Sequence, residues 1–428
     1  MAPTTSLSQS TLSRIDRMLA ATDTLLEQGY PGDDGSRQPV HTVYVPADAF
    51  TPGLAADWGT RALASIEAQG GVSRLAAVLG TSNAPDAVEI AERVEAKLRV
   101  EPIEDLRLDF EDGYGNRGDD VEDGDAIGAA KALAEAVAAG VAPAFIGIRF
   151  KSLEVPTRVR GLRTLDLFVT TLVEAGELPP GLVLTLPKVT TTAQVLAMDA
   201  ATRALEDATG LSRGRLRFEV QVETPQLILG ADGSSPLAQL PHLVPGRISA
   251  LHYGTYDYSA SLAIAAQYQS MEHPVADFAK EVMQLAVAGT GIRLSDGSTN
   301  ILPVGDNVEP GWRLHARLVR RSLERGFYQG WDLHPAQLPS RFFATYLFYR
   351  EGFAAAGERL RSYLEGTPSG MMDEPATARA LAGFVYRGIA CGAIGEKEVQ
   401  ASIKIDAAQL AALAHPKRPR ISSGSDTA

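Results

Sequence analysis

Charged side chains recur where short apolar segments of this sequence end. In chain order they are Glu111 and Asp112, Arg149, Lys188, Glu223 and Asp257. Two carboxylates such as Glu223 and Asp257, completed by water and a chelating substrate, make the oxygen-rich site that Mg²⁺ prefers. An arginine binds a carboxylate through two parallel hydrogen bonds, and a lysine adds positive charge. The combination predicts a site that binds a 2-oxo acid or acyl group while the metal, as Lewis acid, stabilises an enolate.

Eight short apolar segments, separated by longer Ala-rich helical stretches, are expected to position these residues. They cover residues 42–47, 106–112, 144–150, 182–188, 216–223, 248–254, 300–305 and 328–333. Such alternation predicts parallel strands with helical crossovers, and eight repeats close a (β/α)₈ TIM barrel. Because chemistry in these barrels lies at the carboxyl ends of the strands, the charged residues would share one mouth. An open doubly wound sheet is the alternative fold.

The remaining sequence predicts two helical additions and a tail. Residues 1–40 form a leader with one amphipathic helix, and residues 41–340 form the barrel. Residues 341–414 form a helical extension, read either as a lid over the barrel mouth, as a subunit contact or as packing on the barrel wall. Residues 415–428 are polar and are expected to be disordered.

Composition narrows the class of protein. The chain has 428 residues, 45% of them hydrophobic, and a formal net charge of −12. This acidic balance disfavours a nucleic-acid partner, which would require a basic face. The single cysteine, Cys391, suits a reducing compartment, and neither a signal peptide nor a membrane span is apparent. We therefore expect a cytoplasmic protein. The glycine-rich motifs of Rossmann and P-loop proteins are also missing from the sequence.

An ordered set of motifs resembles a known superfamily. The segments VYVPA, DFEDGYG, IGIRF, LPKVTT, VQVETPQ, HYGTYDYSA and WDLHPAQ follow the order of CitE-like members of the HpcH/HpaI aldolase and citrate lyase superfamily. The resemblance covers roughly residues 40–340. DFED and a Gly-x-x-Asp-Tyr motif also resemble malate synthase, which has the same barrel.

The resemblance implies roles for individual residues. It implies that Glu223 and Asp257 ligate Mg²⁺ or Mn²⁺ and that Arg149 binds a substrate carboxylate or carbonyl. It further implies that Glu111 and Asp112 hold metal-bound waters and orient Arg149. Lys188 adds positive charge for catalysis, and Thr224 and Pro225 lie near the substrate.

Each role has a structural alternative. Glu223 and Asp257 could be solvated acids or partners in ion pairs. Arg149 could form a buried bridge to Glu111 or Asp112, and Lys188 could face solvent or pair with an acid. His334, in the WDLHPAQ motif, is read as a structural histidine that packs at the end of the barrel.

The departures from the superfamily patterns are informative. No histidine follows the second predicted strand, which disfavours the HpaI-type branch. Malate synthases are longer and take a catalytic aspartate from a C-terminal domain, a role for which Asp373 is the only candidate we identify. The general base is therefore left open.

The sequence thus predicts a metal-dependent carbon–carbon lyase or aldolase that cleaves or forms a 3-hydroxy acid or its CoA thioester. A malate-synthase-like acyltransferase, condensing acetyl-CoA with a 2-oxo acid such as glyoxylate, is the alternative. A barrel that binds a small acid without turnover is a further one. The use of CoA and a homo-oligomeric state rest on the resemblance alone.

Overall fold

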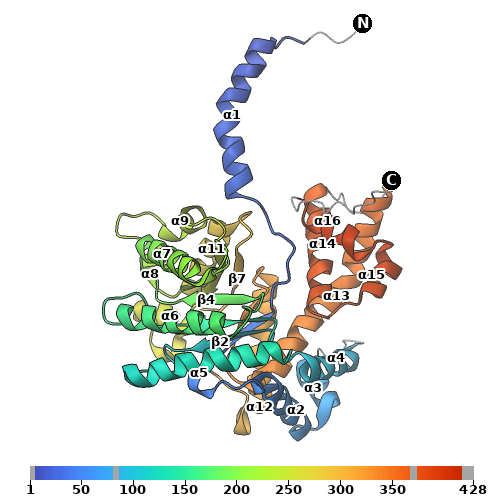
Figure 1. The fold of residues 1–428 in the computed structure, drawn as a ribbon. Helices are drawn as coiled ribbons and strands as arrows, with labels where there is room; N and C mark the ends of the chain where they lie inside the picture. Colours follow the sequence, from blue (N-terminus) through green and yellow to red (C-terminus); the bar gives the residue numbers. More distant parts are fainter. Residues whose placement is uncertain (1–4, 81–85, 367–373, 417–428) are drawn as a thin grey trace, which may run out of the picture.

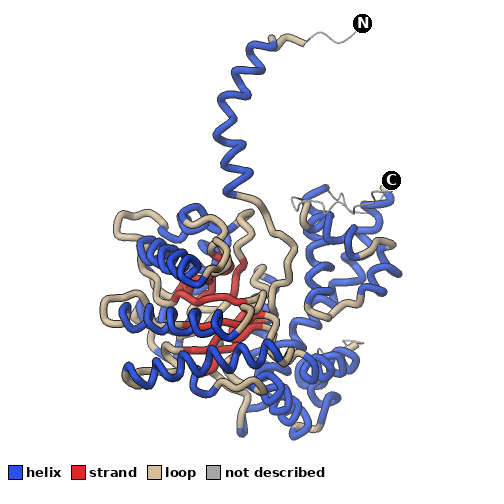
Figure 2. Tube along the Cα trace, in the orientation of Figure 1, coloured by secondary structure: helices blue, strands red, loops and turns tan. Residues whose placement is uncertain are grey.

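A computed structural model describes residues 5–80, 86–366 and 374–416. Eight parallel strands lie in the order β7-β6-β5-β4-β3-β2-β1-β8, with helices around their outside (Figures 1 and 2). The strands are β1 His41–Pro46, β2 Asp105–Asp109, β3 Phe145–Arg149, β4 Leu182–Leu186, β5 Arg217–Val222, β6 Ile248–Tyr253, β7 Arg293–Ser295 and β8 Gly330–Asp332. A parallel bridge between Ser295 and Gln329 joins β7 to the start of β8. The predicted (β/α)₈ barrel is confirmed.

Strands β1 to β5 carry buried apolar residues at alternate positions, on one face. Ile146 and Ile148 of β3 and Leu184 and Leu186 of β4 are fully buried, while Thr185, between the two leucines, contacts Arg107 and Glu219 on the other face. The connections contain helices α2 Leu54–Ala68, α3 Gly71–Leu79, α4 Ala87–Val100, α5 Asp119–Ala138, α6 Arg158–Ala175, α7 Thr192–Thr209, α8 Pro225–Ile228, α9 Pro236–Leu243, α10 Thr255–Ser261, α11 Pro274–Val287 and α12 Val308–Glu324.

The prediction of the seventh strand is wrong in position. Residues 300–305, expected as a strand, form a loop that leads into a short 3-10 helix, Gly305–Asn307. Ile301 and Val304 are 49% and 43% exposed, so the apolar residues of this segment do not belong to a buried strand. The strand lies earlier, at Arg293–Ser295, and its three residues are too short and too polar to show a strand pattern.

Helix α1 (Gln9–Gly29) forms as the leader helix was predicted to. Among the described residues only its end approaches the barrel, where a Cβ at Gly29 would lie 3.2 Å from the His242 ring. The helix has no buried residue, and Figure 1 shows it projecting away from the barrel. Ser8 caps it by accepting a hydrogen bond from the Thr11 N–H at 3.2 Å. The apolar stripe that periodicity predicts is therefore solvent-facing in the single chain, with Met18 73% exposed.

The C-terminal extension consists of α13 Leu338–Glu365, α14 Pro375–Ala390, α15 Glu396–Ile403 and α16 Ala407–Ala414. The first half of α13 is buried against the barrel. The Tyr386 hydroxyl of α14 donates to the Gly35 carbonyl at 2.6 Å, just before β1 and thus at the amino-terminal end of the barrel. These contacts give no support to a lid over the carboxyl-terminal mouth. No helix in the described ranges is both long and apolar enough to cross a membrane.

Candidate active site

The structure brings the six predicted charged residues together at the carboxyl-terminal mouth of the barrel. Arg149 is the last residue of β3, Lys188 and Glu223 follow β4 and β5, and Asp257 lies in the first turn of α10 after β6. Glu111 and Asp112 follow β2 and both contact the Lys188 ammonium group. Parallel strands end at one face of the barrel, which is why residues so distant in sequence converge.

Arg149 is held by a carboxylate that the sequence interpretation did not assign. Its Nε and Nη2 donate to the two carboxylate oxygens of Asp109, each at 2.7 Å, because β2 and β3 pair Asp109 with Arg149. The Arg149 Nη1 lies 3.3 Å from Glu111 Oε2. The predicted bridge therefore exists, but its main partner is Asp109. Burial opposes the charge of Arg149, yet Asp109 raises its pKa well above the usual value.

Lys188 is a fixed cation between two acids. Its Nζ contacts Glu111 Oε1 and donates to Asp112 Oδ1 at 2.8 Å. Burial opposes its charge, but Glu111 and Asp112 overcome this effect and raise the pKa of Lys188. The residue adopts φ of 52°, an uncommon conformation for a side chain other than glycine. This backbone turn aims the Lys188 N–H at Glu223 Oε1, at 2.7 Å.

Glu223 is a buried carboxylate without a cationic partner. It is 2% exposed, and no ion pair to it occurs among the described residues. Burial first, and then the charges of Glu111 and Asp257, raise the pKa of Glu223 to about 8. Gly254 leaves room for this side chain, since a Cβ at that position would lie 2.6 Å from Glu223 Oε2.

Asp257 faces the same cluster. It has no hydrogen bond or ion pair within the parts of the chain that the structure describes. Burial raises the pKa of Asp257, and Asp112 raises it further against the opposing effect of Lys188. Burial also raises the pKa of Glu111. For Asp112 burial acts in the same direction, but the hydrogen bond and charge of Lys188 lower its pKa overall.

These features fit a divalent cation that has two protein ligands. Glu223 and Asp257 supply oxygen donors from adjacent strand ends, and their raised pKa values indicate negative charge that the protein leaves uncompensated. Glu111 Oε2 is buried without an aligned hydrogen bond. No group of three or more His, Cys, Asp or Glu able to hold a metal occurs in the described residues. A cation here would therefore depend on water or substrate oxygens, as Mg²⁺ commonly does.

The other predicted residues are less directly placed. The Thr224 hydroxyl donates to the Val189 carbonyl, so it stabilises the neighbouring loop, and Pro225 begins α8. Their contact with a substrate stays a prediction. His334 accepts a hydrogen bond from the Ala336 N–H at 3.2 Å through Nδ1, which supports its structural reading. Asp373 lies outside the described residues.

Sequence reasoning missed two residues of the site. Asp109 accepts hydrogen bonds from the Glu111 and Gly113 N–H groups as well as from Arg149, so it shapes the acidic turn. Tyr44 of β1 places its ring 4.8 Å from the Arg149 guanidinium carbon. The signal for Asp109 was its position at the end of β2, opposite Arg149 on β3. Because three acids lie close together in that segment, the sequence does not show which of them pairs with Arg149.

Solved structures share this fold at low sequence identity. A citrate lyase from Burkholderia xenovorans LB400 is 18% identical, and the alignment covers 86% of this chain and 97% of that one with a TM-score of 0.56. The CitE protein of Mycobacterium tuberculosis, solved with magnesium, acetoacetate and coenzyme A, is 16% identical over 84% and 99%, with a TM-score of 0.50. A malate synthase of Haloferax volcanii is 15% identical over 88% and 97%, with a TM-score of 0.48.

The first two structures show that this chain shares its barrel fold with the citrate lyase and CitE proteins. No curated protein matches the sequence significantly. A family model described as "Domain of unknown function (DUF6986)" matches residues 19–418. Nearly the whole chain, including the C-terminal helices, is thus covered by one model, and the chain belongs to the DUF6986 family.

Proposed function

We propose that this protein is a Mg²⁺-dependent carbon–carbon lyase or aldolase. It would cleave, or in reverse form, a 3-hydroxy acid or its CoA thioester at the carboxyl-terminal mouth of the barrel. The observation that carries the proposal is the uncompensated pair Glu223 and Asp257 beside two fixed cations, Arg149 and Lys188. The magnesium and coenzyme A present in the CitE structure fit this reading.

The residues divide into a part that holds metal and a part that holds substrate. Glu223 and Asp257 would hold Mg²⁺, and Mn²⁺ would serve in its place. When bound, the cation supplies a Lewis acid that stabilises negative charge on a substrate oxygen. Glu111 and Asp112 would accept hydrogen bonds from waters around the cation, which fixes its surroundings.

Arg149 would orient the acid end of the substrate. Asp109 occupies its Nε and Nη2, so Nη1, beside Glu111 Oε2, is the donor that points to the carboxylate cluster. The two hydrogen bonds to Asp109 fix the plane of the guanidinium group. Little side-chain entropy of Arg149 would therefore be lost when a substrate carboxylate binds.

Lys188 would act as a charge and not as a base. Its raised pKa keeps the ammonium group protonated near neutral pH, so it has no lone pair with which to take a proton. It would position Glu111 and Asp112 and offset charge that develops on the substrate. A carboxylate that does not hold the metal would accept the proton, and Glu111, whose pKa burial raises, is the acid we assign to this role.

The proposal is tested by a substrate screen with the purified protein and Mg²⁺. Free 3-hydroxy dicarboxylic acids and their CoA thioesters are incubated, and release of pyruvate, oxaloacetate or glyoxylate is recorded. We expect Mg²⁺-dependent cleavage of at least one member, lost in Asp257→Asn. The Thr170→Val variant, at an exposed site on α6, serves as the matched control and should retain activity.

Thiol detection separates the two enzymatic alternatives. Release of free CoA from acetyl-CoA and glyoxylate, without cleavage of any 3-hydroxy acid, would assign a malate-synthase-like acyltransferase instead. Binding of 2-oxo acids without turnover in either assay would leave only the non-catalytic barrel. A homo-oligomer and a cytoplasmic location remain predictions that the single chain does not test.

A further inference from the structure

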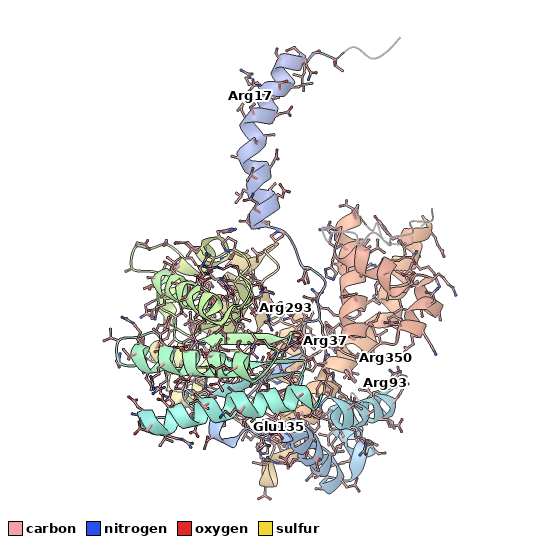
Figure 3. The ribbon with its side chains drawn as sticks, viewed as in Figure 1. Arg17, Arg37, Arg93, Glu135, Arg293 and Arg350 are labelled. Carbon is pink, nitrogen blue, oxygen red and sulfur yellow. The ribbon has the colours of Figure 1, made fainter. Side chains whose placement is uncertain are left out.

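A second charged site lies at the opposite, amino-terminal end of the barrel. A cavity of about 350 Å³ opens there, lined by the segment before β1 and by the amino ends of strands β2 to β7. This volume is within the range of small-molecule sites. Figure 3 shows two of its arginines, Arg37 and Arg293, near the point where the chain descends from α1 toward the barrel.

Three arginines of this cavity have no carboxylate partner. Arg215, Arg217 and Arg293 form no salt bridge with any described residue. Arg215 Nη2 donates to the Leu178 and Pro179 carbonyls, at 3.1 and 2.6 Å. Arg293 Nη2 donates to the Ser36 carbonyl at 2.9 Å.

Arg217 is the least engaged of the three arginines, with one contact of 3.5 Å to the Ile248 carbonyl. Backbone carbonyls and hydroxyls orient all three guanidinium groups but do not neutralise them.

Arg215 and Arg293 are held in a partly desolvated setting, whereas Arg217 is exposed. Burial lowers the pKa of Arg215. Burial also lowers the pKa of Arg293, and the like charge of Arg217 acts in the same direction against Asp34. A guanidinium withdrawn from water without an anion is costly. Other described arginines, such as Arg17 on α1, also lack a salt bridge, but three of them line this one cavity.

The acids at this end do not satisfy the three arginines. The cavity is lined by five arginines and three carboxylates, Asp34, Asp105 and Glu219. Arg37 is already paired with Glu101 and Glu104. Asp34 acts on Arg293 and Arg217 by its charge, without a salt bridge to either. Glu219 is engaged by Arg107 through a bidentate contact and by His252 at 3.1 Å, and Asp105 by Arg107 and Thr42. Positive charge is therefore in excess around the opening, in a chain whose net charge is −12.

We propose that the amino-terminal mouth of the barrel binds a small polyanion, recognised by Arg215, Arg217 and Arg293. The chemistry is that of a ligand with a phosphate group or with more than one carboxylate, which guanidinium groups bind through paired hydrogen bonds. The site is separate from the proposed active site, because barrel chemistry occurs at the carboxyl ends of the strands. It does not depend on the proposed lyase function.

Calorimetry in metal-free buffer tests this site with two probes, pyrophosphate for phosphate ligands and tricarballylate for polycarboxylates. We expect one-to-one, saturable binding of at least one probe. Arg217→Gln and Arg293→Gln should each weaken it about tenfold, the loss of one charge-assisted contact. Arg17→Gln, which removes the same charge from the exposed helix α1 (Figure 3), should leave the affinity unchanged.

Several outcomes would overturn the proposal. They are the absence of saturable binding of both probes to the native protein, equal weakening in Arg17→Gln, or unchanged affinity in both Arg217→Gln and Arg293→Gln. Thermal unfolding of each variant shows whether it is folded. The Arg217→Gln variant is expected to fold normally because Arg217 is exposed. Loss of binding in Glu223→Gln alone would place the anion at the other mouth and would also contradict the proposal.

Discussion

Two glutamates on one strand of this barrel show how the same side chain serves opposite ends. Glu219 and Glu223 lie near the start and just beyond the end of β5, about 13 Å apart along the strand. Both are almost fully buried. Burial acts to raise the pKa of each, but Arg107 and His252 lower that of Glu219 far below its usual range. The pKa of Glu223, which has no such partner, is raised to about 8.

The difference separates a carboxylate that stabilises the fold from one kept available for a ligand. Arg107 donates to Glu219 at 3.0 and 2.6 Å, and the Thr185 hydroxyl donates at 2.6 Å, so Glu219 is fully engaged within the protein. Glu223 accepts one backbone N–H, and burial with the charges of Glu111 and Asp257 outweighs the opposing charge of Arg149. A buried charge left in this state costs stability, which a bound cation would restore.

The largest expected effect on stability comes from replacing Glu219, the glutamate that is paired within the protein. Glu219→Gln removes the charge that faces Arg107 and leaves that buried guanidinium with Asp105 as its remaining carboxylate partner. We expect the free energy of unfolding to fall by about 3 kcal/mol, measured by urea denaturation at pH 7. A loss below about 1 kcal/mol would show that the network contributes no more than a surface ion pair.

Replacing Glu223, the glutamate without a cationic partner, is expected to change the stability in the opposite direction. Glu223→Gln preserves the side-chain shape and the acceptor for the Lys188 N–H but removes the uncompensated acid. In the presence of EDTA at pH 8 this variant should be more stable than the native protein by about 2 kcal/mol. The same urea denaturation measures it, and a variant less stable than the native protein would mean that Glu223 is part of the folding framework.

The space beside Glu223 should matter as well. A Cβ in Gly254→Ala would lie 2.5 Å from the Glu223 Cβ, so the carboxylate must move. We expect a loss of about 1–2 kcal/mol in stability together with weaker Mg²⁺ binding. Gly128→Ala on α5 is the matched control, because its Cβ would meet nothing within 4 Å. If both variants behaved alike, the packing of Gly254 against Glu223 would be irrelevant.

The pH dependence sharpens the same contrast on a smaller scale. Because the folded-state pKa of Glu223 is about 8, above the value of 4.5 for an unperturbed glutamate, the folded metal-free protein keeps a proton that the unfolded chain has lost. Its contribution to stability therefore falls as pH rises between these values, in total by the same roughly 2 kcal/mol expected for Glu223→Gln at pH 8.

The stability difference between the native protein and Glu223→Gln isolates this effect. It should be small at pH 5, grow in favour of Glu223→Gln up to pH 8 and level off above. A difference that stays constant over this range would contradict the raised pKa.

The sequence was sufficient for the barrel and for the convergence of charges at its mouth. Apolar segments ending in Arg149, Lys188 and Glu223 are enough, because parallel strands bring their ends together. The sequence was not sufficient where the role of a residue depends on a partner that is distant in the chain. The sequence RFEVQVE places both glutamates on one face of the strand, but nothing in it shows that Arg107, three strands away in the sheet, pairs with Glu219.

The same limit explains the other discrepancies. Arg149 pairs with Asp109 and not mainly with Glu111 because the strand register places Asp109 opposite it. The sequence of a segment with three nearby acids does not reveal this register. The strand β7 has only three residues, Arg293–Ser295, while the more apolar segment that follows it is a loop. Of the cavity arginines, Arg215 lies just before β5, Arg217 begins β5 and Arg293 begins β7, and only the closed barrel brings them to one cavity.

The central claim is that Glu223 and Asp257 form a cation site that a 2-oxo acid completes. Its most direct test is a calorimetric titration of Mg²⁺, with and without pyruvate, oxaloacetate or glyoxylate, on the native protein, Glu223→Gln and Asp257→Asn. We predict that a 2-oxo acid binds only together with Mg²⁺ and that both substitutions abolish this binding. Absence of Mg²⁺ binding, or unchanged binding in both variants, would contradict the assigned site and the lyase proposal with it.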